Sequence, residues 1–108
     1  MEDYVASVRI RLVERFSDAA LLAYGHIGDG NLHFSIYPGS RDRDAIDEMV
    51  YYPLQALHGT VSAEHGIGLE RKAYLKYTRG EPEIELMRKA KRMMDPDNIL
   101  NPGKLFDL

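Results

Sequence analysis

Residues 25–33, with the sequence GHIGDGNLH, restrict the fold more than any other part of the chain. Asp29-Gly30 at the centre of this segment is typical of a two-residue turn, because a type I′ turn needs positive φ at both central positions. A turn at this point predicts an antiparallel hairpin in which His26 lies directly opposite His33. Both imidazoles are then expected on the same face of a sheet.

The residues after this turn alternate between apolar and polar side chains, which point to opposite faces of a strand. The apolar set is Leu32, Phe34 and Ile36, and the polar set is Asn31, His33 and Ser35. The pattern therefore predicts a strand with one face against a hydrophobic core and one face that carries polar groups.

The two hairpin histidines predict a divalent metal site. Directly opposed residues have Cβ atoms about 4.5–5.5 Å apart, and two imidazoles that close can share one ion, for zinc at about 2.0–2.1 Å. A lone strand histidine is more often structural. Two protonated imidazoles facing each other would repel, however, and a shared ion removes that conflict. His58, in a His-Gly pair, is interpreted instead as the cap of a helix C-terminus.

A second polar cluster occupies residues 62–68, with the sequence SAEHGIG. It is predicted to continue a short strand into a loop that precedes a helix. Neighbouring residues of a regular strand point to opposite faces, so only one of Glu64 and His65 can then bind the ion while the other acts on a substrate. Taken alone, this cluster fits a polar loop better than a site.

The two clusters and the C-terminal residues 95–104, with the sequence DPDNILNPGK, form a set in a fixed order. With these motifs the chain resembles the C-terminal part of the FAD-linked oxidases of the vanillyl-alcohol-oxidase type. The resemblance runs from about Tyr24 to Phe106 and is strongest for D-lactate, glycolate and D-2-hydroxyglutarate dehydrogenases.

The resemblance implies a role for each motif residue. In metal-dependent members of the family, both histidines of the first motif bind a divalent ion, which corresponds to His26 and His33. The glutamate of the second motif, Glu64, completes the ligand set, and the following His65 is similar to the proposed base that removes the hydroxyl proton. Asn101, in the Leu-Asn-Pro-Gly-Lys ending, corresponds to an asparagine near the flavin ring.

The resemblance also implies the reaction, which is oxidation of a small D-2-hydroxy acid to the 2-oxo acid. The expected cofactors are FAD and a divalent metal, for which zinc, manganese and iron are all compatible with nitrogen and oxygen ligands. Some relatives carry an asparagine two residues after the second motif histidine. This chain has Ser35 at that position, so the substrate preference is open among lactate, glycolate and 2-hydroxyglutarate.

The length of 108 residues predicts a single domain, residues 1–108. No Gly-x-Gly-x-x-Gly fingerprint for a dinucleotide is present. We therefore expect a C-terminal fragment of the substrate or cap domain, with FAD bound mainly by a missing N-terminal domain. A fragment of this kind is expected to be inactive alone, and to self-associate through surfaces that the truncation exposes.

Composition excludes some classes of protein. The net charge of −3 provides no basic face, so no nucleic-acid partner is expected. The chain has no cysteine for disulfides or thiolate ligands, no signal peptide and no apolar run near 18 residues. A cytoplasmic location is the expectation, with the complete enzyme at most peripheral to a membrane.

Periodicity and turn residues predict an α+β fold. Helices are expected at residues 3–16, 44–57 (divided at Pro53), 69–77 and 81–94, and strands at 20–26, 31–37 and 60–63. Pro38-Gly39-Ser40 should end the hairpin, and the tail should be irregular, with Ile99, Leu100, Leu105 and Phe106 docked. The order suggests a partial ferredoxin-like antiparallel sheet with helices on one face and a C-terminal helical extension.

Two other functional classes fit part of the sequence. A stand-alone metal-dependent hydrolase could use the same ligands to activate water, with His65 as proton carrier, but it gives residues 100–104 no role. A non-catalytic ferredoxin-like binding module would make the histidines structural. Metal content separates the binding module from the other two classes.

Overall fold

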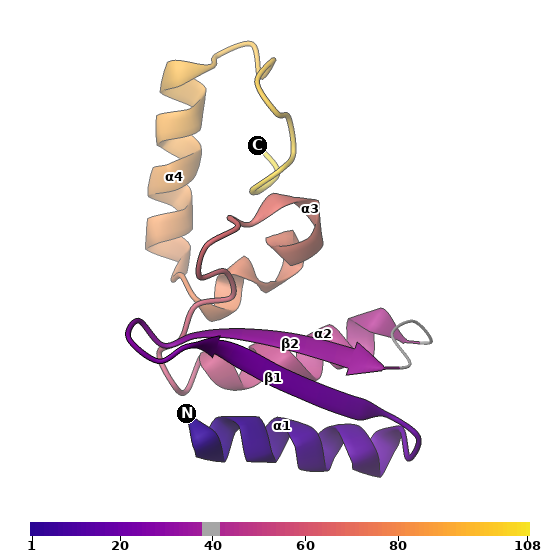
Figure 1. The fold of residues 1–108 in the computed structure, drawn as a ribbon. Coiled ribbons are helices and arrows are strands. Elements are labelled where there is room, and N and C mark those ends of the chain that lie inside the picture. Colours follow the sequence, from indigo (N-terminus) through magenta and orange to yellow (C-terminus); the bar gives the residue numbers. More distant parts are fainter. Residues whose placement is uncertain (38–41) are drawn as a thin grey trace. The chain divides into compact units, whose positions relative to one another are not determined.

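The computed structural model describes residues 1–37 and 42–108. It divides into two compact units, Met1–Pro53 and Leu54–Leu108. The regular elements among the described residues are helices and one antiparallel pair of strands, so the predicted α+β class is confirmed (Figure 1). The predicted turn at Pro38-Gly39-Ser40 lies outside the described residues.

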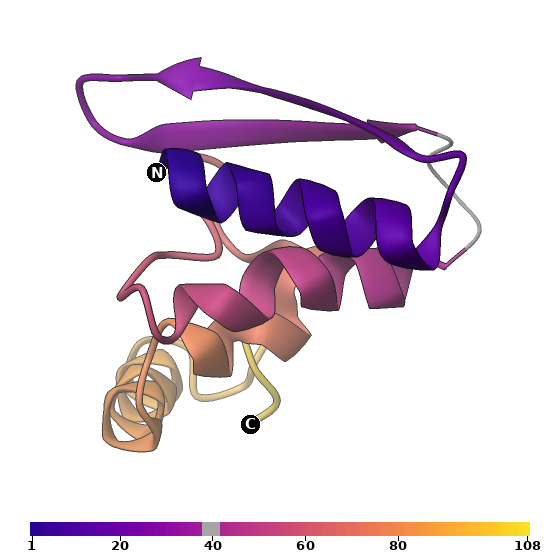
Figure 2. The same cartoon turned by 90° about the horizontal axis from the view of Figure 1, so that it is seen from below.

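The first unit contains a hairpin and two helices. Helix α1 is Glu2–Arg15, strands β1 and β2 are Ala20–His26 and Asn31–Tyr37, and helix α2 is Arg43–Tyr51. Both predicted strands are confirmed at their bounds. Helix α1 packs against β1 and against α2, and Figure 2 shows both helices on one side of the hairpin.

The core of this unit forms where α1 meets the apolar face of the hairpin. Val8 and Leu12 are the most buried side chains. Tyr4 connects three elements: its ring stacks on Phe34 of β2, and its hydroxyl donates a hydrogen bond of 2.6 Å to the carbonyl of Val50 in α2. Burial raises the pKa of Tyr4 to about 12.

The second unit is helical. Helix α3 is Gly68–Arg71, the 3₁₀ helix η2 is Lys72–Tyr77, and helix α4 is Glu81–Met94. The backbone N–H of Gly80 donates to Glu83 Oε2, which caps the start of α4. Leu75, Ile84 and Phe106 form the core of the unit.

The predicted third strand at residues 60–63 is wrong, because this segment is irregular. Hydrogen bonds to threonine side chains replace strand pairing: Thr60 Oγ1 accepts from the N–H of Ser62 at 3.4 Å, and the N–H of Val61 donates to Thr78 Oγ1 at 3.0 Å. Among the described residues the sheet therefore has two strands.

Two predicted helices are shorter than expected. Helix α2 ends at Tyr51, and Pro53 lies in a short 3₁₀ helix, Tyr52–Leu54, because proline has no N–H to continue the α-helical bonds. His58 follows in a turn with φ of 53°, where its N–H donates to the carbonyl of Gln55 and the N–H of Gly59 donates to the carbonyl of Leu54, the backbone pattern of a helix C-cap. The predicted helix at residues 69–77 is α-helical for one turn and then continues as η2.

The C-terminal tail docks through fewer side chains than predicted. Phe106 is buried, but Ile99 and Leu100 are 72% and 67% exposed. The backbone of the tail is held by polar contacts, which an apolar pattern does not predict. None of the helices in residues 1–37 and 42–108 has the length and apolar character needed to cross a membrane.

Candidate functional site

The hairpin presents His26 and His33 on its open face, but in a different register from the predicted one. His26 pairs with Asn31, and His33 pairs with Tyr24. The prediction that His26 lies directly opposite His33 is therefore wrong by two residues. Asp29 does not adopt the positive φ that a type I′ turn requires, so the chain closes through a longer loop.

Contacts within the loop explain this register. Asp29 Oδ1 accepts a hydrogen bond of 3.1 Å from the N–H of Asn31, and the N–H of Gly30 donates to the carbonyl of His26. Gly30 has a φ of 70°, which suits glycine at the end of the loop. The loop thus spans four residues, from Ile27 to Gly30.

A shift of two residues keeps every side chain on its predicted face, because the side chains of a strand alternate with a period of two. His26 and His33 are therefore diagonal neighbours, and their ring centres lie 6.0 Å apart. His26 is exposed, and His33 is half-buried. The hairpin brings together the two imidazoles that the sequence selected.

Two further side chains on the hairpin contact these imidazoles. The ring of Tyr24 stacks on His33, with 5.1 Å between the ring centres and an angle of 13° between the planes. Asp29 Oδ2 lies 3.7 Å from His26 Nδ1. Sequence reasoning used Asp29 only as a turn residue and gave Tyr24 no role, although Tyr24 lies two residues before His26 and therefore on the same face.

Glu64 and His65 lie in the irregular loop of the second unit, and their side chains meet. His65 Nε2 lies 3.1 Å from Glu64 Oε1. The prediction that these side chains point to opposite faces is therefore wrong, because the segment is not a regular strand. The loop therefore pairs a carboxylate with an imidazole.

Hydrogen bonds to one carbonyl hold this loop. The carbonyl of Gly66 accepts from Ser62 Oγ at 2.6 Å and from the guanidinium of Arg71 at 3.3 Å. Gly66 and Gly68 have φ of 74° and 58°, in the left-handed region that glycine adopts without a steric penalty. The glycines of the second motif thus allow the chain to turn directly after His65.

Asn101 lies in the tail, which is organised by Asp95. The carboxylate of Asp95 accepts from the N–H groups of Ile99 and Leu100, each at 2.9 Å, and pairs with Lys91. The hydrogen bond from Lys91, followed by those from the two amides, lowers the pKa of Asp95. Asn101 is exposed just beyond this turn and has a φ of 45°.

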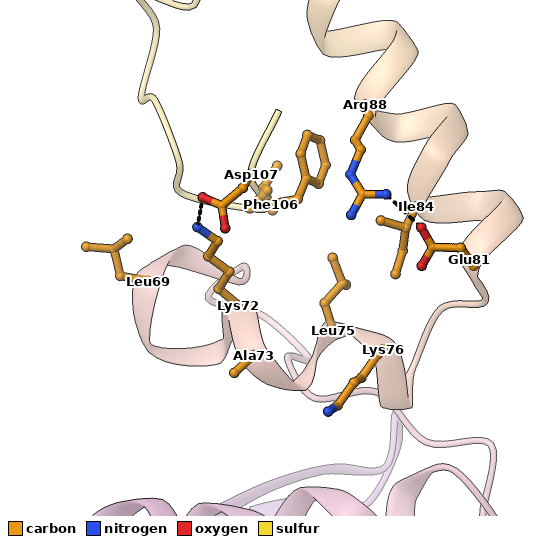
Figure 3. Close-up of a pocket in the computed structure, with 11 residues that line it drawn as sticks. Leu69, Lys72, Ala73, Leu75, Lys76, Glu81, Ile84, Arg88, Phe106 and Asp107 are labelled. Carbon is orange, nitrogen blue, oxygen red and sulfur yellow. Dashed lines mark hydrogen bonds and ion pairs between the residues drawn. The ribbon is translucent and has the colours of Figure 1, made fainter.

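The second unit also contains an open pocket of about 450 Å³, shown in Figure 3. Helices α3, η2 and α4 and the tail line it. Lys72 Nζ donates to Asp107 Oδ1 at 2.5 Å, and the guanidinium of Arg88 lies 5.9 Å from the ring centre of Phe106. A hydrogen bond to Glu81 raises the pKa of Arg88. The pocket lining includes none of the predicted site residues.

The predicted site residues fall in both units. His26 and His33 belong to the first unit, and Glu64, His65 and Asn101 belong to the second. The structure brings the two histidines together on the hairpin and brings Glu64 to His65 in the loop. The joint ligand set of His26, His33 and Glu64 stays a prediction.

Comparison with known proteins identifies relatives that match most of the chain. Residues 1–105 match the family described as FAD linked oxidases, C-terminal domain. The chain is 41% identical over 101 residues to a D-2-hydroxyglutarate dehydrogenase of Stutzerimonas stutzeri, an alignment that covers 86% of this chain and 22% of that protein.

Two other relatives carry the same name. The dehydrogenase of Xanthomonas citri pv. viticola is 40% identical over 115 residues, covering 99% of this chain and 24% of the relative. The mitochondrial dehydrogenase of Danio rerio is 44% identical over 87 residues, covering 78% of this chain and 16% of the relative. The chain thus spans less than a quarter of the length of each of the three.

Proposed function

This chain belongs to the family of C-terminal domains of FAD-linked oxidases, and we propose that it supplies the metal ligands and the catalytic base of a D-2-hydroxyglutarate dehydrogenase. The complete enzyme would oxidise the hydroxyl group of a D-2-hydroxy acid to a 2-oxo group. Residues 1–108 would form a single domain, the C-terminal part of the substrate or cap domain.

One observation carries this proposal, which is the 40% identity to the Xanthomonas citri dehydrogenase over 99% of this chain. An alignment of that extent takes in all three motifs. It favours a dehydrogenase over a stand-alone hydrolase, because the hydrolase has no use for the C-terminal motif.

His26, His33 and Glu64 are the proposed ligands of a divalent ion. Two imidazoles that bind the same zinc ion, each at about 2.0–2.1 Å, have ring centres no more than roughly 6.5 Å apart. The centres of His26 and His33 lie 6.0 Å apart, which fits this limit. When bound, zinc, manganese or iron would act as a Lewis acid on the substrate hydroxyl.

His65 is the proposed acceptor of the hydroxyl proton, because imidazole is the side chain best suited to proton transfer near neutral pH. Its contact with Glu64 Oε1, at 3.1 Å, restrains the ring. A carboxylate has two oxygens, so Glu64 can contact His65 through Oε1 and ligate the ion through Oε2. The pair would then couple the position of the base to that of the ion.

Asn101 is proposed to face the flavin ring. The turn held by Asp95 fixes the backbone just before Asn101, whose side chain is exposed and therefore accessible to a partner. FAD would accept the hydride from the substrate carbon. The main FAD-binding residues are proposed to lie in an N-terminal domain of the complete enzyme, since the 108 residues contain no dinucleotide fingerprint.

The proposed substrate is D-2-hydroxyglutarate rather than lactate or glycolate, because the three relatives are named as D-2-hydroxyglutarate dehydrogenases. Ser35 follows His33 by two residues on β2 and therefore shares its face of the hairpin. We place Ser35 at the edge of the substrate region, where it would influence the choice among hydroxy acids.

A chimera tests this function. Residues 1–105 would replace the matching segment of the Stutzerimonas stutzeri dehydrogenase, and oxidation of D-2-hydroxyglutarate, D-lactate and glycolate would be measured. We expect turnover that is fastest with D-2-hydroxyglutarate. His65→Gln should lower kcat by at least about 100-fold, the usual contribution of a general base.

His58→Gln is the matched control, because His58 belongs to the same unit and has no proposed role. It should leave kcat unchanged. Full activity of the His65→Gln chimera would contradict the assignment of the base. The isolated chain supplied with FAD and an electron acceptor should show no turnover, and it should self-associate in sedimentation experiments.

Metal analysis tests the proposed ligands independently of the proposed reaction. The purified chain should bind about one divalent ion, as expected for a single site of this ligand type. The double variant His26→Ala/His33→Ala should lose that ion. Retention of the ion by the double variant would refute the hairpin site.

A further inference from the structure

The carboxylate of Asp29 is held at the tip of the hairpin. Its Oδ1 atom accepts the N–H of Asn31 at 3.1 Å, which fixes the side chain to the loop backbone. Its Oδ2 atom lies 3.7 Å from Nδ1 of His26, close enough for electrostatic attraction but longer than a hydrogen bond. The two oxygens thus have different partners, one in the backbone and one on an imidazole.

A carboxylate near one ring nitrogen biases where a neutral imidazole carries its proton. Neutral histidine has one N–H and one lone pair, and the partner of one nitrogen sets the role of the other. An ionised carboxylate only accepts hydrogen bonds, so it favours the proton on the nearer nitrogen. For His26 this nitrogen is Nδ1, and Nε2 keeps the lone pair.

We propose that Asp29 is a positioning residue for His26: its negative charge favours the imidazole proton on Nδ1 and thereby presents Nε2 as the ligand atom. The inference rests on the proposed metal site and deepens it. Histidines that bind metals generally donate their other N–H to a carboxylate, a carbonyl or water, and removal of such a partner typically weakens metal binding by 10–100-fold. Both side chains are largely exposed, so we expect about tenfold.

The variant Asp29→Asn separates the charge from the turn. An asparagine amide can still accept the N–H of Asn31 through Oδ1, so the loop closes as before. The atom that faces His26 then becomes an NH₂ group, which donates. The preferred tautomer should therefore reverse, with Nδ1 as acceptor and the proton on Nε2.

The test is ¹⁵N NMR of the four histidines in the metal-free 108-residue chain, at a mildly alkaline pH where imidazoles are generally neutral. In the wild-type chain, His26 should be mainly in the Nδ1–H form, the reverse of an unpartnered imidazole. Asp29→Asn should shift it to the Nε2–H form. Asp18→Asn, an exposed residue in the turn before β1, is the matched control and should leave His26 unchanged.

Zinc titration of the same proteins by calorimetry gives the second readout. The dissociation constant should rise about tenfold in Asp29→Asn and stay unchanged in Asp18→Asn. Equal zinc affinity of the wild-type chain and Asp29→Asn would overturn the inference.

A wild-type chain in which His26 is mainly Nε2–H would also overturn it, with no need for a variant that folds. A wild-type chain with the Nδ1–H form that binds no zinc would support the contact between Asp29 and His26. The same result would refute the metal site of the proposed function, so the two failures are distinguishable.

Discussion

The hairpin at residues 20–37 and the tail at residues 95–108 both present proposed site residues, but different interactions hold them. Regular strand pairing and burial of an apolar face on α1 hold the hairpin. Side-chain contacts to backbone groups, centred on Asp95, hold the tail. Two of the three proposed ligands, His26 and His33, therefore lie on a periodic element, whereas the proposed flavin contact lies on an irregular one.

The largest expected effect is on the core beneath the hairpin. Leu12 of α1 is 1% exposed, so Leu12→Ala should lower the free energy of unfolding by about 3 kcal/mol through lost burial and a cavity. Ile10→Ala, on the exposed face of the same helix, is the control and should change it by no more than about 0.5 kcal/mol. Urea unfolding followed by circular dichroism measures both.

If Leu12→Ala were as mild as Ile10→Ala, burial would not hold the hairpin on α1. The contrast with the tail would then disappear.

The second effect tests the close approach of the two strands. A Cβ atom at Gly25 would lie 1.9 Å from the carbonyl oxygen of Asn31, so Gly25→Ala must displace the backbone of the hairpin. We expect a loss of about 2 kcal/mol, within the range for overpacked positions. At Gly28 a Cβ atom would meet nothing within 4 Å, so Gly28→Ala is the control.

Amide chemical shifts across both strands give the measurement for these glycine variants. Gly25→Ala should perturb the pairs near His26, whereas Gly28→Ala should leave them in place. Equal perturbation by the two variants would show that the loop, rather than the strand contact, sets the register.

A smaller effect concerns the polar link between α1 and α2. Tyr4→Phe removes the hydrogen bond to the carbonyl of Val50 and keeps the ring on Phe34, so stability should fall by about 1 kcal/mol. Tyr37→Phe, at an exposed ring, should change little.

The contribution of Tyr4 to the free energy of unfolding should fall as the pH rises. The pKa of Tyr4 is raised to about 12 in the folded chain, so the protonated form is favoured by folding. This contribution is complete below the ordinary tyrosine pKa near 10 and is lost as the pH rises toward the folded value. Stability should therefore decline above about pH 10 in the wild type and decline less in Tyr4→Phe; equal slopes would contradict the assignment.

Periodic features of the fold were predictable from the sequence, whereas features that depend on particular side chains were not. Alternation in β2 placed Leu32, Phe34 and Ile36 on one face, and the even shift in register left that placement intact. The register itself depends on whether Asp29 adopts positive φ, which its bond to the N–H of Asn31 decides. The Asp-Gly dipeptide alone does not show whether Asp29 adopts positive φ.

The second motif shows the same limit. The sequence predicted roles for Glu64 and His65 next to a strand, but the strand at residues 60–63 is absent because Thr60 and Thr78 bind the backbone N–H groups instead. The link between Val61 and Thr78 joins residues far apart in the sequence. No local propensity encodes it, so the contact between Glu64 and His65 could not be predicted.

The smallest expected effect, confined to the tail, is the sharpest test of the comparison. The lowered pKa of Asp95 means that its ionised form is favoured by folding. Its contribution is therefore present above the ordinary carboxyl pKa and is lost as the pH falls through the lowered folded value. Asp95→Asn should remove this acid dependence and increase hydrogen exchange at the amides of Ile99 and Leu100, while the amides of β1 and β2 exchange as in the wild type.

Asp97→Asn, at an exposed carboxyl two residues away, is the control and should leave those amides protected. If Asp95→Asn left Ile99 and Leu100 protected, apolar docking through Phe106 would be sufficient to order the tail. The hairpin and the tail would then be held by the same kind of interaction, and the fixed position of Asn101 would need another source.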